Sequence, residues 1–368
     1  MRHKIIFLLI LAALPLWACA PVLPPENPHL SPAAELYYQS LLNDRELDVY
    51  QRLAAGVSAS ASSISFPYLL DQQTLKQAIE RLTADRPDLY WFNGGGNLSV
   101  RHPFLFPTSC YSPEYLYDTE QIAARAPALK QATADFLACA QGLDSEYEQA
   151  LAIYRQVILR TQYQTGAPDN QNLCSVLLNG VSVCGGYAKT MQYLLQNLGI
   201  QAAYISGRLL DGGESHAWVL MRLDGEYYFA DPTLGDPLTQ EGVQLPAEAC
   251  IDYAWFGLNS AEMAQTHEAK SDLPLPHCTA EKANYYRAEG LYLENYSRQA
   301  LLPLLQSCLE KNAPLFTFRL ADDAGFDRAQ NDLLQDGGAF DLLKQAGISQ
   351  QDLLYTVNES KRIITLLL

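Results

Sequence analysis

Apolar residues recur every three or four positions in several segments, which is the spacing of an amphipathic helix. These segments cover residues 31–56 (as one long helix or two short ones), 72–84, 119–142, 145–163, 184–198, 260–267, 301–311 and 324–346. Ser145 and Glu148 stand where a capping box would begin the fourth helix. The fifth begins at Cys184, and Gly199 follows its last apolar residue. The pattern therefore predicts a chain rich in helices.

Strands are predicted where apolar and polar residues alternate or where aromatic residues cluster. Such segments cover residues 89–92, 216–222, 226–231, 315–320, 353–357 and 361–367. Gly94-Gly95-Gly96 follows the first of them, and we interpret it as a hairpin tip because no Lys-Ser/Thr follows, as a phosphate loop would require. Asp224-Gly225, between the second and third segments, strongly indicates a two-residue hairpin turn.

Helices and strands are interleaved without an internal repeat, so the predicted fold class is α+β. The chain has 368 residues, which is more than one domain of ordinary size needs. The predicted organisation is a leader over 1–18, a proline-rich tether over 19–30, an N-terminal accessory α+β region over 31–118, a central domain over 119–272 and a C-terminal α+β accessory domain over 280–368.

The start of the chain has the pattern of a bacterial export signal. Arg2 and Lys4 precede an apolar run over 5–16 that is too short to span a membrane as a mature helix. Ala18 before Cys19 resembles a lipobox, which implies that Cys19 is lipid-modified and becomes the N-terminus. An ordinary signal peptide with an incidental cysteine is the alternative. We therefore expect a lipid-anchored protein on the extracytoplasmic side of the cell membrane.

The formal net charge is −16, and removing the leader would make the mature chain more acidic. Such a surface repels phosphate backbones, which argues against nucleic acid as a partner. Export permits disulfides, but spacing selects no pairing among Cys110, Cys139, Cys174, Cys250, Cys278 and Cys308. Because no second ligand pair at zinc spacing accompanies His277-Cys278, the sequence predicts no metal and no cofactor.

Three residue types that together make a thiol nucleophile occur in order as Cys184, His216 and Asp231. Cys184 lies at the predicted N-terminus of a buried helix, where free amides and the helix dipole favour a thiolate. A two-residue hairpin turn would place Asp231 opposite Trp218, with His216 as its diagonal neighbour on the same face. Another loop length would shift this register by a residue or two. Either way, an imidazole and a carboxylate can meet on one sheet face.

The segments around these residues resemble the transglutaminase-like superfamily, whose core is papain-like. They are Gly180–Ala188 (GVSVCGGYA), His216-Ala217-Trp218 and Asp231-Pro232-Thr233, and the resemblance covers roughly residues 140–270. It implies a helix carrying the cysteine, packed on an antiparallel sheet that carries the histidine and the aspartate. By position, the resemblance makes Cys184 the nucleophile, His216 the base and Asp231 the residue that orients the base.

Other candidate site residues are less sharply defined. Gln171 sits where many bacterial members of that family have a glutamine and is a candidate for stabilising an oxyanion; an ordinary loop amide is the alternative. Tyr187 and Trp218 are candidates for pocket walls, with core aromatic residues beside the site as the alternative. His267 and His277 receive no role beyond surface or packing residues.

The predicted function is that of a thiol enzyme acting on amide bonds of peptides or proteins through an acyl-enzyme, either as a peptidase or amidase or by acyl transfer to an amine. The alternative is a catalytically silent surface module of the same fold that binds peptide or glycan. Expected partners are a peptide or protein substrate, for instance in the cell envelope, and the membrane through the N-terminal lipid. The sequence leaves open the substrate, the choice between hydrolysis and transamidation, the roles of the accessory regions and the oligomeric state.

Overall fold

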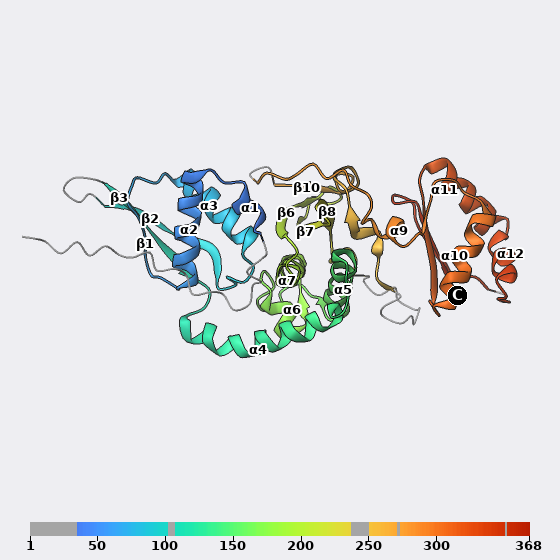
Figure 1. Cartoon of the computed structure of the whole chain (residues 1–368), viewed down its shortest axis with the longest axis horizontal. Coiled ribbons are helices and arrows are strands. Elements are labelled where there is room, and N and C mark those ends of the chain that lie inside the picture. The colour runs from blue at the N-terminus through green and yellow to red at the C-terminus, as the bar shows by residue number, and fades with distance from the viewer. Residues whose placement is uncertain (1–34, 102–106, 237–249, 271–272, 350–351) are drawn as a thin grey trace, which may run out of the picture.

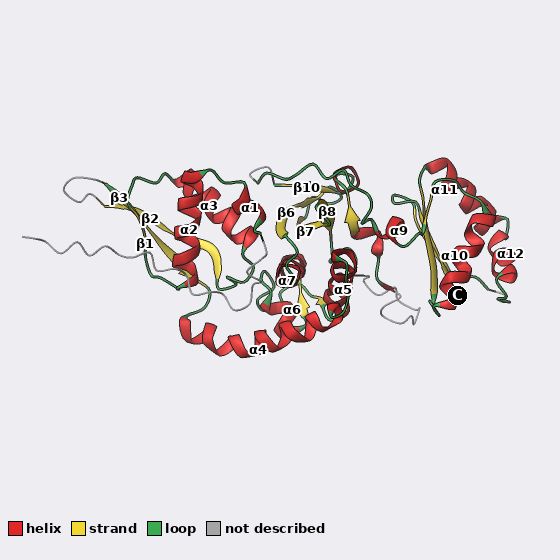
Figure 2. Ribbon diagram, in the orientation of Figure 1, coloured by secondary structure: helices red, strands yellow, loops and turns green. Residues whose placement is uncertain are grey.

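The computed structural model describes residues 35–101, 107–236, 250–270, 273–349 and 352–368. The predicted leader, Cys19 and the tether lie outside these ranges. Three groups of helices and strands follow one another along the long axis of the molecule, each around its own sheet (Figure 1). This mixture of helices and largely antiparallel sheets confirms the predicted α+β class (Figure 2). Within the described ranges, none of the helices has both the length and the apolar run that crossing a membrane requires.

The first group surrounds a three-stranded sheet in the order β1-β3-β2. Its elements are α1 (Tyr37–Ser40), α2 (Asp44–Ser58), β1 (Ile64–Phe66), α3 (Gln72–Asp85), β2 (Phe92–Arg101) and β3 (Thr108–Tyr115). The segment predicted as one helix or two is thus two helices, and the side chain of Asn43 caps the second. Leu53 of α2 and Leu82 of α3 pack with Phe66 and Tyr111 of the sheet in one apolar cluster.

The glycine run is not a hairpin tip, so that prediction was wrong. The run lies inside β2, and the aromatic residues before Phe92 are not part of the strand. The register of β2 against β3 shifts between Phe92 and Gly96. Gly96 has a φ of +151°, and a Cβ there would lie 2.5 Å from the Tyr111 hydroxyl. A glycine is therefore needed where β2 passes close over the Tyr111 side chain.

The central group is built on a five-stranded sheet in the order β10-β6-β7-β8-β9, with antiparallel pairs throughout. Its elements are α4 (Thr119–Leu137), α5 (Glu146–Leu159), β4 (Gln162–Tyr163), α6 (Cys174–Asn179), β5 (Val181–Ser182), α7 (Cys184–Asn197), β6 (Ala202–Leu209), β7 (Ser215–Leu223), β8 (Glu226–Ala230), β9 (Phe256–Leu258), α8 (Ser260–Met263) and β10 (His267–Ala269). Val219 and Met221 of β7 pack with α5 and α7, whereas Trp218 and Leu220 join a cluster with Tyr38 of α1. Both faces of the sheet are therefore covered.

Three predicted helices of the central group are shorter than expected. The helix predicted over 119–142 ends at Leu137, and a short 3₁₀ helix over Ala138–Ala140 follows. The helix predicted over 145–163 has the expected Ser145 capping box but ends at Leu159, and a two-residue strand follows. The helix predicted over 260–267 ends at Met263, and His267 instead begins β10 at the edge of the sheet. In contrast, α7 begins at Cys184 and ends before Gly199, as predicted.

The helix that carries Cys184 is also tied to the N-terminal group. Gln196 of α7 donates hydrogen bonds through Nε2 to the carbonyl oxygens of Asp85 and Ala202, each at 2.9 Å. Gln192 donates to the carbonyl oxygen of Ala84 at 2.7 Å. These bonds join the end of α3, the helix α7 and the start of β6, so the N-terminal group helps to fix the position of α7.

The C-terminal group surrounds a four-stranded sheet in the order β11-β12-β14-β13. Its elements are α9 (Tyr285–Ala288), β11 (Tyr292–Leu293), α10 (Arg298–Glu310), β12 (Leu315–Leu320), α11 (Asp323–Gln330), α12 (Gly338–Gln345), β13 (Tyr355–Asn358) and β14 (Ile363–Leu367). The helix predicted over 324–346 is broken before Gly338, as the paired glycines allow. The predicted strands over 315–320, 353–357 and 361–367 correspond to β12, β13 and β14. The limits of the three predicted domains themselves stay predictions.

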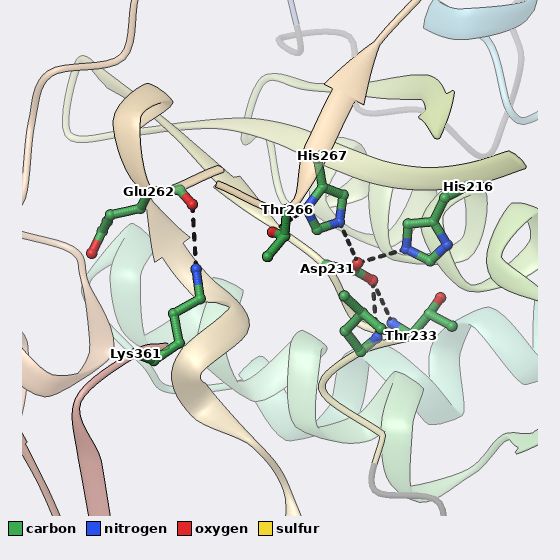
Figure 3. Close-up of polar contacts among 8 residues, drawn as sticks. His216, Asp231, Thr233, Glu262, Thr266, His267 and Lys361 are labelled. Carbon is green, nitrogen blue, oxygen red and sulfur yellow. Dashed lines mark hydrogen bonds and ion pairs between the residues drawn. The ribbon is translucent and has the colours of Figure 1, made fainter. Parts of the chain in front are cut away.

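Buried polar contacts join the C-terminal sheet to the central group. Arg319 of β12 forms an ion pair with Glu262 of α8 at 2.7 Å, and the arginine side chain is only 5% exposed. Lys361 donates through Nζ to the carbonyl oxygen of Glu262 at 3.3 Å and lies 4.8 Å from the centre of the Trp255 ring (Figure 3). Glu262 therefore connects two cations of the C-terminal group to the central sheet.

We expect Glu262→Gln to lower the free energy of unfolding by about 3 to 5 kcal/mol, because it leaves the Arg319 guanidinium buried without its counter-charge. Urea denaturation followed by circular dichroism measures this. Asp341→Asn is the matched control, since Asp341 pairs with Arg298 at an exposed site and should change the same quantity by at most about 1 kcal/mol. Equal effects of the two substitutions would contradict the role given to Glu262.

Candidate active site

A tight hairpin brings the imidazole of His216 to the carboxylate of Asp231. β7 and β8 pair from Leu223 opposite Glu226 to Val219 opposite Ala230, so the turn has two residues, as predicted. Asp224 and Gly225 in this turn both have positive φ, of 51° and 87°, which a type I′ turn requires. Asp231 follows β8 directly, and its Oδ2 lies 2.6 Å from His216 Nε2.

Asp231 is fully buried, and its carboxylate accepts four hydrogen bonds. Oδ2 accepts from Nε2 of His216 at 2.6 Å and from Nε2 of His267 at 3.0 Å, and Oδ1 accepts from the backbone N–H groups of Thr233 and Leu234 at 2.9 and 3.1 Å (Figure 3). Burial by itself would raise the pKa of Asp231, but the bonds from the two imidazoles lower it to about 2. The carboxylate therefore stays charged at neutral pH.

His216 is held as an imidazolium between Asp231 and Cys184. Burial lowers its pKa, but its hydrogen bonds with Asp231 and with the Cys184 side chain raise it more, from 6.5 to about 10. Since Nε2 is bonded to Asp231, the other ring nitrogen, which points away from Asp231 in Figure 3, is the one left for the sulfur. The structure thus brings together the three residues that the sequence placed in order.

Cys184 is the first residue of α7 and lies in a cavity of about 540 Å³. His216 and Gln171 line the same cavity. A Cβ on Gly185 would lie 2.5 Å from the Gln171 side-chain oxygen, so the glycine lets the Gln171 amide lie against the start of the helix. The backbone N–H of Cys184 has no partner within the helix, as at any helix start. The cavity that contains Cys184 therefore has two potential donors, this N–H group and the amide nitrogen of Gln171.

The cavity is rimmed by charged side chains that are already paired. Arg208 and Glu268 form an exposed ion pair at 2.5 Å, and Lys270 pairs with Glu80 at 2.9 Å. Tyr204 and Ser206 add neutral polar groups to the lining of the same cavity. The cavity thus offers hydrogen-bonding groups without a net excess of one charge.

Tyr187 and Trp218 do not line the cavity, so the prediction of pocket walls was wrong for both. Tyr187 is buried, and its hydroxyl donates to the carboxylate of Asp236 at 2.6 Å. Trp218 is buried behind His216, with the two ring centres 6.3 Å apart and the planes nearly parallel. Both are core aromatic residues beside the site, which was the alternative left open.

His267 belongs to the site although no role was predicted for it. Its side chain is fully buried and shares Asp231 with His216. His267 lies 36 residues beyond Asp231 and begins a three-residue edge strand. No spacing rule in the sequence connects these two residues, and the pairing of β10 with β6 brings them together. The other unassigned histidine, His277, has an exposed side chain and takes no part.

Among the described residues, the cluster that could hold a metal ion consists of His216, Asp231 and His267, whose ligand atoms lie within 4.8 Å of one another. In the arrangement found, however, both imidazoles donate N–H groups to the same carboxylate oxygen. A metal ion would have to replace those two protons, so we assign no metal to the cluster. The seven cysteines in the described ranges are free thiols.

Residues 136–232 match the family model of the transglutaminase-like superfamily. The chain carries a transglutaminase-like domain. The matched range contains Cys184, His216 and Asp231, and its start falls near the end of α4. This agrees with the family resemblance of the sequence around the three residues. None of the curated proteins matches the chain.

Several solved structures are similar to part of the chain. A structure described as a TGase is 15% identical, with 50% of this chain and 53% of that one covered and a TM-score of 0.29. A candidate cysteine protease from Cytophaga hutchinsonii is 14% identical, with 39% and 64% covered and a TM-score of 0.27. The periplasmic domain of TgpA from Pseudomonas aeruginosa, bound to ethylmercury, is 21% identical, with 36% and 58% covered and a TM-score of 0.24. The chain thus spans between half and two thirds of the length of these three proteins. Their TM-scores are too low to support an inference about activity.

We expect Asp231→Asn to lower the pKa of His216 from about 10 towards or below its ordinary value of 6.5, because the counter-charge is lost while burial remains. Titration of the imidazole signals by NMR measures this shift. Because the pKa of His216 is raised on folding, its pair with Asp231 stabilises the fold fully below about pH 6.5, and that contribution is lost as the pH rises through about 10.

Asp224→Asn is the control for this titration, since Asp224 lies exposed in the turn of the same hairpin and should leave His216 unchanged. A pKa of His216 that stays the same in Asp231→Asn would show that the carboxylate does not hold the imidazolium.

Proposed function

We propose that the chain is a thiol enzyme that acts on amide bonds of peptides or proteins, with Cys184 as the nucleophile. The observation that carries the proposal is that Cys184, at the start of a helix, lines one cavity with His216, whose Nε2 lies 2.6 Å from the buried, ionised carboxylate of Asp231. A helix start and an adjacent imidazolium are the two surroundings that favour a reactive thiolate in proteins. A carboxylate behind the imidazole completes the arrangement that such nucleophiles share.

In the proposed reaction, the sulfur of Cys184 attacks the carbonyl carbon of the amide. The C–N bond breaks as His216 gives its proton to the leaving nitrogen, and the acyl group remains on Cys184 as a thioester. Water or a primary amine then attacks this thioester, and His216 takes the proton from the attacking group as the sulfur leaves. Cys184 and His216 return to their starting state, and Asp231 stays ionised throughout.

The negative oxygen that forms in each attack needs donors aimed at it. The backbone N–H of Cys184 and the side-chain amide of Gln171 are our candidates, because Gln171 lines the cavity with Cys184 and lies against Gly185. Because the charged side chains of the lining are paired and Tyr204 and Ser206 are neutral, the cavity suits an uncharged carbonyl group, such as a peptide bond or a glutamine side chain. Whether water or an amine resolves the thioester decides between hydrolysis and cross-linking.

The site of action follows from the start of the sequence. The pattern of an export signal over 1–18, followed by Cys19, supports a lipid-anchored enzyme on the extracytoplasmic side of the membrane. We therefore propose that its substrates are proteins or peptides of the cell envelope or the surrounding medium. This location favours hydrolysis of amide bonds slightly over cross-linking.

We expect an electrophile such as iodoacetamide at pH 6 to label Cys184 at least about tenfold faster than the other cysteines in the described ranges, because a thiolate is the reactive form. Burial raises the pKa of Cys174 to about 12 and that of Cys278 to about 11, which makes both poor nucleophiles. Peptide mapping by mass spectrometry measures the rates. His216→Ala should reduce the rate at Cys184 to that of the half-exposed Cys139; uniform labelling, or labelling unaffected by this substitution, would refute the mechanism.

We expect Gln171→Ala to lower kcat by roughly 10² to 10³-fold with KM changed only a few-fold, which is the usual effect of removing one oxyanion donor. The substrate is found by incubating the mature protein with a peptide library, with and without a primary amine, and measuring product masses. Asn170→Ala, in the same loop but outside the cavity lining, is the matched control and should retain normal kcat. Equal kcat for Gln171→Ala and the unaltered protein would remove Gln171 from the oxyanion site.

A further inference from the structure

One oxygen atom of Asp231 is shared by two buried imidazoles. Oδ2 lies 2.6 Å from His216 Nε2 and 3.0 Å from His267 Nε2, and the His267 side chain is fully buried (Figure 3). An ionised carboxylate can only accept hydrogen bonds, so Nε2 must carry a proton in both rings. His216 reaches the cavity, whereas His267 is absent from its lining. The two histidines therefore bond to the same oxygen, but only His216 also lines the cavity.

The tautomer of His267 is fixed from its other side. Thr266 Oγ1 lies 2.8 Å from His267 Nδ1. In the neutral ring, Nδ1 is an acceptor once Nε2 carries the proton, so the threonine hydroxyl donates to it. This contact favours the tautomer that donates to Asp231. A chain of hydrogen bonds thus runs from Thr266 through His267 and Asp231 to His216 and the cysteine sulfur.

Aromatic rings surround His267 and leave it little freedom to turn. The Trp218 ring packs edge-on at 4.8 Å between centres, the Trp255 ring at 5.7 Å, and the His216 ring at 5.4 Å. Among the described residues, the charged groups that face this cluster are Asp231 and the His216 imidazolium, with Lys361 and Asp252 on the side of the Trp255 ring. The position of Nε2 is therefore set by packing as well as by the bond that it makes.

We propose that His267 is a positioning residue of the proposed active site. It holds Asp231 Oδ2 in the direction of His216 through the whole reaction. His216 must gain and lose a proton at its other nitrogen in each cycle, so the strength of its own bond to Asp231 alternates. His267 faces no substrate and keeps its bond throughout. Together with the N–H groups of Thr233 and Leu234 on Oδ1, it fixes the carboxylate at three points that do not depend on His216.

A merely structural histidine would have a different signature from a positioning one. If His267 only satisfies a buried carboxylate, its replacement changes stability and raises the pKa of Asp231, but it does not lower the pKa of His216. If it positions Asp231, its replacement weakens the bond between Asp231 and His216, so the imidazolium of His216 loses its proton at lower pH. The titration of His216 therefore separates the two roles without any assay of activity.

The test compares His267→Phe, which keeps a ring without a donor, with His267→Gln, whose side-chain amide reaches the position of Nε2, and with Thr266→Val, which removes only the hydroxyl. We expect His267→Phe to lower kcat about 10 to 100-fold with KM within about twofold, which is the usual size of effects from residues that orient a catalytic group. The His216 titration and the alkaline limb of kcat/KM should both move to lower pH. His267→Gln should restore most of kcat, of the His216 pKa and of the alkaline limb. In all three measurements, Thr266→Val should give values between those of the unaltered protein and His267→Phe.

This inference rests on the proposed function, but the two can fail separately. An unaltered protein that forms no acyl-enzyme while His267→Phe still shifts the NMR titration of His216 would refute the function and leave the positioning role. An active protein in which both His267→Phe and Thr266→Val leave the His216 titration and the alkaline limb unchanged would refute the positioning role and leave the function. If His267→Phe does not fold, Thr266→Val decides alone, because it removes one hydroxyl without a change of shape: a shifted titration supports the role and an unshifted one overturns it.

Discussion

The central group depends on keeping one carboxylate charged in a place that water does not reach. An isolated buried carboxylate costs several kcal/mol, and it persists only where hydrogen bonds replace those of water. Asp231 has four such bonds, from β7, from β10 and from the turn that follows β8. Both strands of one hairpin and the separate edge strand β10 must therefore meet at one side chain.

The same constraint links the site to the rest of the molecule. Asp231 raises the pKa of His216 and so keeps it protonated. His216 therefore supplies a positive charge beside Cys184. The helix that presents Cys184 is held by the end of α3 through Gln192 and Gln196. On the other side, Trp255 packs between His267 and Lys361 of the C-terminal group. The flanking groups thus contact the elements that carry the site, and Glu80 of the N-terminal group also pairs with Lys270 at the cavity.

Local features of the sequence allowed the main part of the site to be predicted. A two-residue turn at Asp224-Gly225 fixes the register of its hairpin, so the meeting of His216 and Asp231 could be predicted from spacing alone. The start of α7 at Cys184 was equally local, because apolar periodicity and Gly199 mark both ends of the helix. These predictions needed no knowledge of how distant segments pack.

What could not be predicted depends on contacts between distant segments. His267 was assigned to the end of a helix, and only the pairing of β10 with β6 brings it to Asp231. Gly96 is needed because Tyr111 of a neighbouring strand lies beneath it, which no local pattern records. Tyr187 follows Cys184 closely in sequence, yet its side chain is buried in the core and its hydroxyl bonds to the distant Asp236. Long-range packing decides each of these cases.

The central claim is that Cys184 forms a covalent acyl-enzyme, and intact-protein mass spectrometry after a rapid acid quench tests it most directly. The protein is mixed with a peptide carrying an activated ester, which acylates faster than the thioester is resolved. The account predicts one added acyl group, located on Cys184 by peptide mapping, released by hydroxylamine and absent in Cys184→Ser and in His216→Ala. An acyl group on another residue, or none on the unaltered protein, would contradict the account.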